Sequence, residues 1–161
     1  MFQVEDGSGL PDANSFASVA FADAYFADRG VTTWAGPNAD KQTALVRGTD
    51  YINSFFEKRF KGVQLTDTQA LCFPRDVAGA LPTALLKATS EYALRALTGT
   101  QLAPDLQTSA SGQLVLEERK KLGPLEKETK YSERTAATMR AYPAADALLT
   151  KLLKYSSGVM R

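Results

Sequence analysis

The spacing of the apolar residues changes along the chain, and this change restricts the fold more than any other feature of the sequence. Between residues 39 and 59 the large apolar side chains lie on one helical stripe: Leu45, Ile52, Phe55 and Phe56. Beyond Gly112 the period becomes two, at 113–117 and again at 125–130, as in β-strands. Together the two patterns predict a mainly α protein: a small helical bundle with an appended β-hairpin and extended N- and C-terminal arms.

Three further segments have the spacing of helices. Ser18 is placed to cap a first helix, which Gly30 ends. A helix is expected at 81–97, because Pro82 stands at an early position where a helix needs no N–H donor. The last helix is expected at 143–155.

Three residues refine this prediction. Gly48 lies in the middle of the 39–59 helix, where glycine costs about 1 kcal/mol relative to alanine. Its presence indicates either close packing against another helix or a tolerated weakness. Thr66 and Gln69 have the spacing of a capping box, which predicts a brief helical turn at 67–71.

A length of 161 residues fits one domain. The expected parts of this single domain (1–161) follow in order: an N-terminal arm at 1–17, a helical core at 18–100, a β-hairpin at 113–131, a C-terminal helix at 143–155 and a tail at 156–161. A two-stranded ribbon is at best marginally stable in water, so the hairpin is expected to pack on another surface, such as a neighbouring copy of the chain. The arm, the hairpin and the tail are three extensions expected to have no place within one monomer.

Charge is nearly balanced overall but uneven along the chain. The 19 basic and 18 acidic residues give a net charge of +1, too little for a whole-molecule attraction to nucleic acid or acidic membranes. Residues 1–80 carry a balance of −3 and residues 81–161 a balance of +4. The hairpin supplies much of the positive charge: Arg119, Lys120, Lys121, Lys127 and Lys130. These residues either face a polyanion or keep an exposed ribbon soluble.

Catalytic and metal chemistry find little support in the sequence. The chain has no histidine, which excludes a Ser-His-Asp triad and removes the commonest metal ligand. A lone cysteine, Cys72, with Arg75 as its nearest basic residue, is better explained as a small buried thiol than as a nucleophile. We therefore expect no enzyme activity, no catalytic residues, no cofactor and no metal.

Two carboxylate pairs and the glycine spacing of the chain also give little support for enzyme activity. Asp23 and Asp28 share no helix face well, and Glu117 and Glu118 are adjacent in a strand and would point to opposite sides. No glycine-rich phosphate-binding spacing occurs. The N-terminus lacks the pattern of a secretory signal, and no apolar stretch approaches membrane-spanning length. The protein is expected to be soluble, without membrane partners, and to be made in the cytoplasm.

Aromatic and basic residues occur together between positions 51 and 61: Tyr51, Phe55, Phe56 and Phe60 beside Lys58, Arg59 and Lys61. Such a cluster could stack the bases of single-stranded DNA, at roughly 1 to 3 kcal/mol for each base. The same aromatics fall at helical spacing, which favours a core role. The basic residues would then mark a solvated helix end.

A series of short motifs runs through most of the chain in a fixed order: Ala13-Asn14-Ser15-Phe16, Ser18-Val19-Ala20, Ala24-Tyr25-Phe26, Gly30, Trp34, Ala44-Leu45, Thr49-Asp50-Tyr51-Ile52, Gln69-Ala70-Leu71, Phe73-Pro74-Arg75, Leu81-Pro82, Ala88, Ala93-Leu94, Lys121-Leu122-Gly123-Pro124-Leu125-Glu126, Tyr142-Pro143 and Asp146-Ala147-Leu148-Leu149. Each motif is weak alone, but the shared order is specific. Together they resemble the head-to-tail connector (adaptor) proteins of tailed bacteriophages. Phe73 stands where that family is expected to have Trp, a change that preserves an aromatic plug.

This resemblance implies a structural protein of the virion neck, assembled in the host cytoplasm. It implies a homo-oligomeric ring, of twelve copies, that docks on the phage portal protein, extends the DNA channel and receives the next tail component. Packaged DNA would pass without sequence-specific contacts, and the basic hairpin residues could line the channel or join subunits. The C-terminal segment would be the arm that reaches the portal: Tyr155, Ser156, Ser157, Gly158, Val159, Met160 and Arg161.

The sequence also resembles DnaT, a single-stranded DNA binding protein of the primosome. That resemblance implies the alternative function, a DnaT-like module that binds single-stranded DNA. The cluster at 51–61 would then supply the contacts.

Overall fold

The computed structural model describes residues 1–77, 80–103, 115–121, 126–131 and 141–154, and in the two strands it describes the backbone. The chain divides into two compact units, which we describe separately. One, the helical unit, comprises Met1–Leu102 and Ala141–Arg161; the other comprises Ala103–Arg140 and contains a hairpin. No helix in the described part of the chain is long and apolar enough to cross a membrane.

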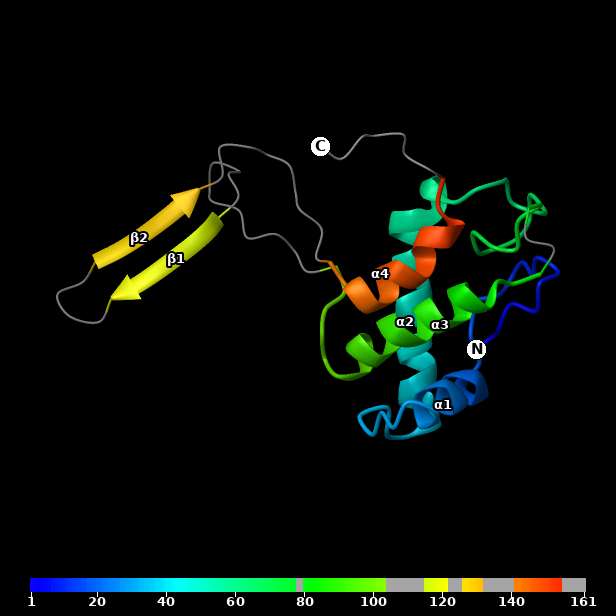
Figure 1. Cartoon of the computed structure of the whole chain (residues 1–161), viewed down its shortest axis with the longest axis horizontal. Coiled ribbons are helices and arrows are strands. Elements are labelled where there is room, and N and C mark those ends of the chain that lie inside the picture. Colours follow the sequence, from blue (N-terminus) through cyan, green and yellow to red (C-terminus); the bar gives the residue numbers. More distant parts are fainter. Residues whose placement is uncertain (78–79, 104–114, 122–125, 132–140, 155–161) are drawn as a thin grey trace. The chain divides into compact units, whose positions relative to one another are not determined.

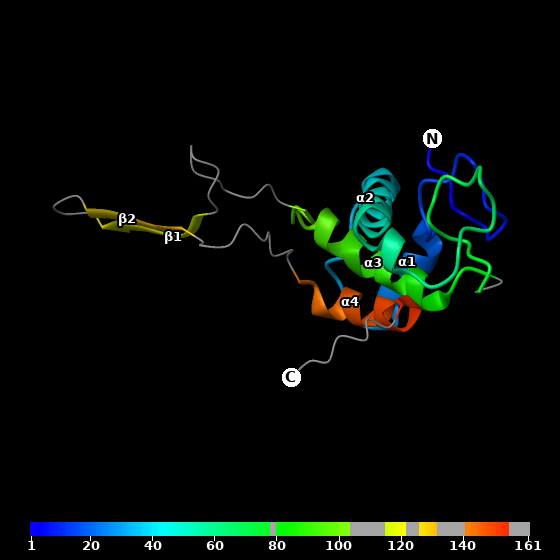
Figure 2. The same cartoon turned by 90° about the horizontal axis from the view of Figure 1, so that it is seen from above.

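The described residues of the helical unit form four α-helices: α1 (Val19–Ala27), α2 (Asn38–Phe56), α3 (Thr83–Leu97) and α4 (Pro143–Leu149) (Figure 1). Short 3₁₀ turns extend α2 and α4, namely η1 (Glu57–Arg59) and η2 (Thr150–Leu152). Helix α3 is central, with α2 on one side and α4 on the other (Figure 2). The predicted mainly α class and small helical bundle are therefore confirmed.

Local sequence signals set the ends of α1. The Ser18 hydroxyl accepts a hydrogen bond from the Phe21 N–H at 3.1 Å, as an N-cap does. Gly30 adopts φ +63°, a left-handed conformation that favours glycine, and the Val31 N–H then donates to the Phe26 carbonyl at 3.0 Å. Both boundaries agree with the sequence prediction.

Gly48 marks the closest approach of α2 to α3. A Cβ atom at this position would lie 2.9 Å from the Thr89 carbonyl oxygen and 3.1 Å from the Ala93 nitrogen. Only a residue without a side chain lets the two backbones come so near. Of the two explanations that the sequence left open, close packing is confirmed.

The core of the helical unit is rich in aromatic side chains. Its largest fully buried residues come from the N-terminal segment, from all four helices and from the segment after η1: Phe16, Phe26, Leu45, Ile52, Phe60, Leu85, Tyr92 and Leu149. The rings meet edge to face or tilted, as for Phe60 and Phe73, whose centroids lie 4.9 Å apart. Phe73 is thus the buried aromatic plug that the sequence predicted.

The expectation that residues 1–17 lack a place within the monomer is wrong. Their backbone is irregular, but Phe16 and Ala17 are buried in the core, and the Phe16 N–H donates to the Thr49 hydroxyl at 3.2 Å. The buried Glu5 carboxylate accepts three backbone N–H bonds, from residues 7, 9 and 10, at 2.9 to 3.0 Å. This carboxylate folds the polar segment onto itself and provides acceptors for the backbone N–H groups of the segment.

The link between α2 and α3 is held by side chains rather than by helix. The Thr66 N–H donates to the Gln69 side chain at 2.9 Å, which is half of the predicted capping box. Residues 67 and 68 form a turn, and no helix follows. The buried Gln69 amide instead donates to the carbonyls of Leu71 and Pro74 at 2.7 and 3.1 Å, which fixes the loop.

The second unit contains the predicted β-hairpin. Strand β1 (Val115–Lys121) pairs antiparallel with β2 (Glu126–Tyr131), and the register is irregular between Val115 and Glu117. The expected connection at 122–124 lies outside the described residues, as does the tail at 156–161. The predicted helix at 143–155 is shorter in the structure, because α4 ends at Leu149 and η2 at Leu152.

Candidate functional site

The aromatic residues at 51–60 are mainly core residues. The exposed fractions of Tyr51, Phe56 and Phe60 are 5%, 5% and 0%, whereas Phe55 is 37% exposed. The Tyr51 ring lies 4.8 Å from that of Tyr92, which is itself fully buried. The core explanation is confirmed for three of the four rings, so they offer no faces on which bases could stack.

A polar pair within this aromatic core orients α4. The Tyr92 hydroxyl donates to one oxygen of the Asp146 carboxylate, and the Tyr142 N–H donates to the other at 2.8 Å. Burial, with Asp146 adding to it, raises the pKa of Tyr92. The hydroxyl therefore stays protonated and serves as a structural donor.

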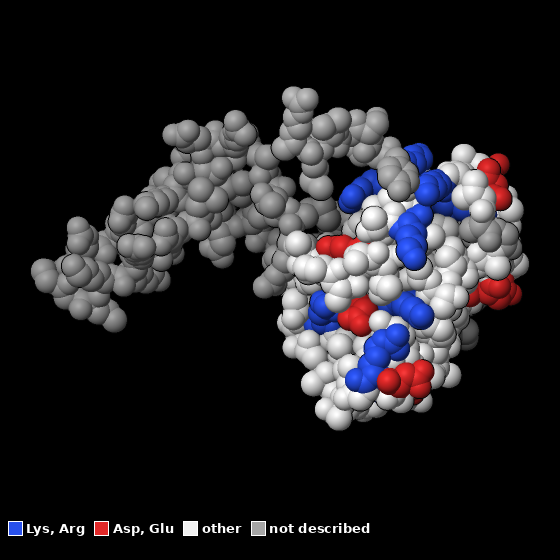
Figure 3. All heavy atoms as spheres, in the orientation of Figure 1, with Lys and Arg blue, Asp and Glu red and all other residues white. Residues whose placement is uncertain are grey.

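The basic residues near η1 lie on the surface, and the fold adds two more to them. The Lys61 N–H donates to the Leu152 carbonyl at 3.0 Å, and the Lys154 N–H donates to the Arg59 carbonyl at 2.7 Å. These bonds bring two distant segments together into one exposed group, which we call the basic cluster: Lys58, Arg59, Lys61, Lys151 and Lys154. Figure 3 shows Lys and Arg side chains gathered on the upper part of the helical unit.

Sequence reasoning placed the first three members of this cluster together but missed Lys151 and Lys154. About 90 residues separate the two segments, and they meet through an isolated bridge between Phe60 and Leu153. No local pattern signals such a pairing. In the sequence, the available signal was two lysines three positions apart, at 151 and 154.

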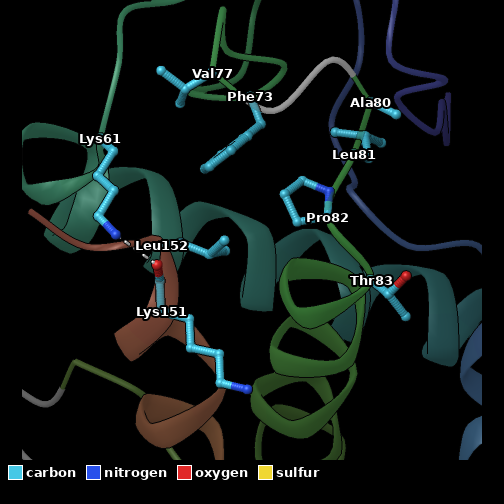
Figure 4. Close-up of a pocket in the computed structure, with 9 residues that line it drawn as sticks. All are labelled: Lys61, Phe73, Val77, Ala80, Leu81, Pro82, Thr83, Lys151 and Leu152. Atoms are coloured by element: carbon cyan, nitrogen blue, oxygen red, sulfur yellow. Dashed lines mark hydrogen bonds between the residues drawn. The ribbon is translucent and has the colours of Figure 1, made fainter.

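An open pocket of about 440 Å³ lies beside the basic cluster (Figure 4). Its lining comes from the segment after η1, the segment that leads into α3, and η2: Lys61, Phe73, Val77, Ala80, Leu81, Pro82, Thr83, Lys151 and Leu152. Figure 4 shows Phe73, Pro82 and Leu152 pointing toward the hollow, while the Lys61 ammonium points to the Lys151 carbonyl oxygen, 3.1 Å away. The floor is apolar, and the charged lining residues among those described are both lysines.

Arg75 stabilises the backbone near this pocket. Its buried guanidinium donates to the backbone carbonyls of Cys72, Gly62 and Glu57 at 2.9, 2.5 and 3.0 Å. Its carbon Cζ also lies 5.6 Å from the centroid of the Phe73 ring. Because its N–H donors bind main-chain carbonyls, the Arg75 side chain connects the segment after α2 to the loop before α3.

Cys72 has the environment of a structural thiol. It is buried, and this burial raises the pKa of its thiol to about 12, although Arg75 opposes the shift. A thiol with so high a pKa holds little reactive thiolate near neutral pH. The interpretation of Cys72 as a small buried residue is therefore confirmed.

Of the carboxylate pair named from the sequence, Asp23 and Asp28, the structure gives Asp23 two side-chain partners. Asp23 accepts hydrogen bonds from Trp34 at 2.7 Å and from Lys41 at 2.9 Å. Burial alone would raise the pKa of Asp23, but the hydrogen bonds from Lys41 and Trp34 outweigh it and lower the pKa. Among the described residues, no three Cys, Asp or Glu side chains gather in a group that could hold a metal ion.

The structure describes the backbone of the five basic hairpin residues that were predicted to line the channel or join subunits. Arg119, Lys120 and Lys121 lie in β1, and Lys127 and Lys130 lie in β2. The register pairs Arg119 with Glu128, Lys121 with Glu126 and Lys120 with Lys127. The portal-binding candidates at 155–161 lie outside the described residues.

A family model described as "Putative DnaT-like ssDNA binding protein" matches residues 1–161. No curated protein and no solved structure matches the chain. Because the family model covers the chain from end to end, this protein belongs to the DnaT-like family so described.

Proposed function

We propose that the protein is a structural adaptor in the neck of a tailed phage. Copies of the chain would form a ring, of twelve subunits, that docks on the portal protein, extends the DNA channel and receives the next tail component. It would assemble in the host cytoplasm and reside in the virion. The proposal rests on the ordered motifs of the sequence and on one structural observation, the separate hairpin unit.

The hairpin is the observation that carries the proposal. Strands of seven and six residues pair into a two-stranded ribbon that belongs to a unit of its own. Such a ribbon is at best marginally stable in water and needs a surface on which to pack. A neighbouring copy in a closed ring supplies that surface, because heterologous contacts repeat around the rotation axis.

The register of the hairpin suits a channel through which DNA must slide. Three basic residues, Arg119, Lys121 and Lys130, stand opposite acidic ones, whereas Lys120 stands opposite Lys127. Opposite charges at paired positions reduce the net attraction to phosphates, and like charges retain some of it. A ribbon of this composition attracts the DNA backbone weakly and reads no bases.

Electron microscopy of the protein mixed with purified portal tests the proposal. We expect portal particles to carry an added ring of density. A control variant, in which a short Gly-Ser linker replaces 113–131, should keep the circular dichroism of the helical unit and lose the ring. Portal particles without added density, under conditions that support neck assembly, would contradict the proposal.

Binding of single-stranded DNA is the second candidate. The family description names it, and the basic cluster offers a positively charged surface beside the partly exposed Phe55. Against it, Tyr51, Phe56 and Phe60 are buried and cannot stack bases. Titration of a labelled oligonucleotide at rising salt separates the two candidates, because phosphate contacts weaken steeply with salt. Tight, salt-sensitive binding would favour this function.

A further inference from the structure

We propose that the pocket between η1, the segment leading into α3, and η2 is a docking site for an acidic peptide segment of a partner protein, with aliphatic side chains in the hollow and carboxylates at its lysine rim. The inference is independent of ring formation, since every residue that it uses belongs to the helical unit.

The first argument is that exposed aliphatic side chains lie on the loop that contributes Val77 to the pocket. The exposed fractions of Val63, Leu65 and Val77 are 66%, 51% and 64%, the largest among the described large hydrophobics apart from Met1. All three stand on one loop, where the Leu65 N–H donates to the Pro74 carbonyl at 3.1 Å and the Asp76 N–H to the Val63 carbonyl at 3.1 Å. Exposed aliphatic residues that gather in this way mark a surface that a partner covers.

The second argument is charge. The charged residues that line the pocket, among those described, are Lys61 and Lys151, and the rest of the basic cluster continues from them. Three exposed carboxylates, Glu57, Asp67 and Asp76, stand on the same segments, and Asp76 already accepts the Val63 N–H at 3.0 Å. Five cations against three carboxylates leave this surface positive, which attracts an acidic partner and repels a basic one.

The third argument distinguishes a peptide from nucleic acid. Base stacking needs exposed aromatic faces, and the aromatic residue in the lining, Phe73, is buried. The accessible lining is aliphatic, chiefly Val77, Leu81 and Leu152. A volume of about 440 Å³ is also within the range of roughly 300–1,000 Å³ typical of ligand pockets. Aliphatic side chains flanked by Asp or Glu fit such a site better than bases do.

The occupant is expected to come from another protein rather than from the hairpin or tail of a second copy. The hairpin at 113–131 carries five basic and four acidic residues, and the charged side chain of the tail at 156–161 is Arg161. Neither segment has the net negative charge that the basic cluster attracts.

Fluorescence anisotropy with the full-length protein tests the proposal. The probe is a rhodamine-labelled synthetic peptide that alternates leucine and glutamate. Two comparison peptides carry glutamine in place of glutamate, or serine in place of leucine. We expect the first peptide to bind and both comparison peptides to bind at least about tenfold more weakly, because each lacks one half of the recognition.

Surface variants then locate the site. Lys151→Glu and Val77→Ser should each weaken binding of the leucine–glutamate peptide by about tenfold. Arg47→Glu, an exposed position on α2 with the same change in charge as Lys151→Glu, should leave the affinity nearly unchanged. Circular dichroism checks that all three variants remain folded.

Three results would overturn the proposal. The first is that the leucine–glutamate peptide does not bind. The second is that Lys151→Glu and Arg47→Glu weaken its binding equally, which would indicate an unspecific charge effect. The third is that a labelled oligothymidylate binds at this surface and loses affinity in Lys151→Glu, while the peptide does not bind. None of these measurements involves portal protein, so their outcome is separate from that of the ring.

Discussion

At the residue scale, the sequence predicted well those features that depend on neighbours along the chain. Ser18 marks the start of α1 and Gly30 marks its end, as expected, because capping and the left-handed conformation are local effects. Gly48 could be interpreted only as one of two possibilities until its neighbours on α3 were known. The role of Arg75 was not predicted, since it binds carbonyls of Gly62 and Glu57, far from it along the chain. The role of Glu5 was missed although its partners, residues 7, 9 and 10, are close in sequence.

Gly48→Ala tests the close approach of α2 and α3. Alanine favours a helix by about 1 kcal/mol over glycine, but its Cβ would lie 2.9 Å from the Thr89 carbonyl oxygen. We expect the contact to prevail and the free energy of unfolding to fall by about 1 to 3 kcal/mol, measured in urea. Ser54→Ala, an exposed position on the same helix, serves as control and should change stability by less than about 0.5 kcal/mol. A more stable Gly48→Ala protein would contradict this packing.

Alkaline pH should destabilise the helical unit. Burial raises the pKa of Tyr51 from 10.0 to about 12, and it raises the pKa of Cys72 from 9.0 to about 12. Both groups are neutral when protonated, so the unfolded chain releases these protons at lower pH than the folded one. The stabilisation is complete below about pH 9 and is lost as the pH rises toward about 12.

Urea unfolding at a series of alkaline pH values measures this effect. The free energy of unfolding of the wild type should fall steadily above about pH 9, and Tyr51→Phe should show a shallower fall because it removes one of the contributing groups. Equal slopes for the two proteins would show that Tyr51 ionises alike in the folded and unfolded states.

At the element scale, α4 depends on α3 for its position, because its carboxylate Asp146 accepts from the Tyr92 hydroxyl and from the Tyr142 N–H. The α4 segment was predicted from its apolar spacing, yet its early end and the turn η2 were not. The bridge between Phe60 and Leu153 draws the chain away from helical geometry there. The pocket and the basic cluster both arise at this junction, which explains why sequence reasoning found only part of them.

Asp146→Ala is expected to loosen α4. The buried Tyr92 hydroxyl would lose its acceptor, at a cost of about 1 to 3 kcal/mol in the free energy of unfolding. Tyr92→Phe in the same background should cost less than it does in the wild type, since the unsatisfied hydroxyl is then absent. A double-mutant cycle measures this coupling. Strictly additive effects of the two substitutions would contradict the role assigned to Asp146.

At the scale of the whole molecule, the chain divides into a helical unit and a hairpin unit, whereas the sequence was interpreted as one domain with an appended hairpin beyond Gly112. The number of extensions was overestimated, because residues 1–17 pack into the helical core. Their glycine, proline and aspartate content is typical of exposed arms, but Phe16 is bonded to Thr49 of α2, and Glu5 is buried among backbone N–H groups of its own segment. The hairpin and the tail are therefore the remaining candidate connectors of the proposed ring.

Deletion of 156–161 tests the tail as the connector to the portal. We expect the truncated protein to keep the circular dichroism and the unfolding midpoint of the full chain, because exposed termini seldom carry core contacts. Its attachment to the portal, measured by co-sedimentation, should be weaker. A chain that fails to fold without these residues, or that binds the portal as before, would refute the assignment.

The central claim is that copies of this chain form a closed ring on the portal. A cryo-electron microscopy reconstruction of the complex formed from purified portal and full-length protein tests it most directly. The account predicts twelve copies in one ring coaxial with the portal, each hairpin packed against a neighbouring copy around an open channel. A reconstruction of the portal alone, with the protein left as monomers in solution, would contradict it.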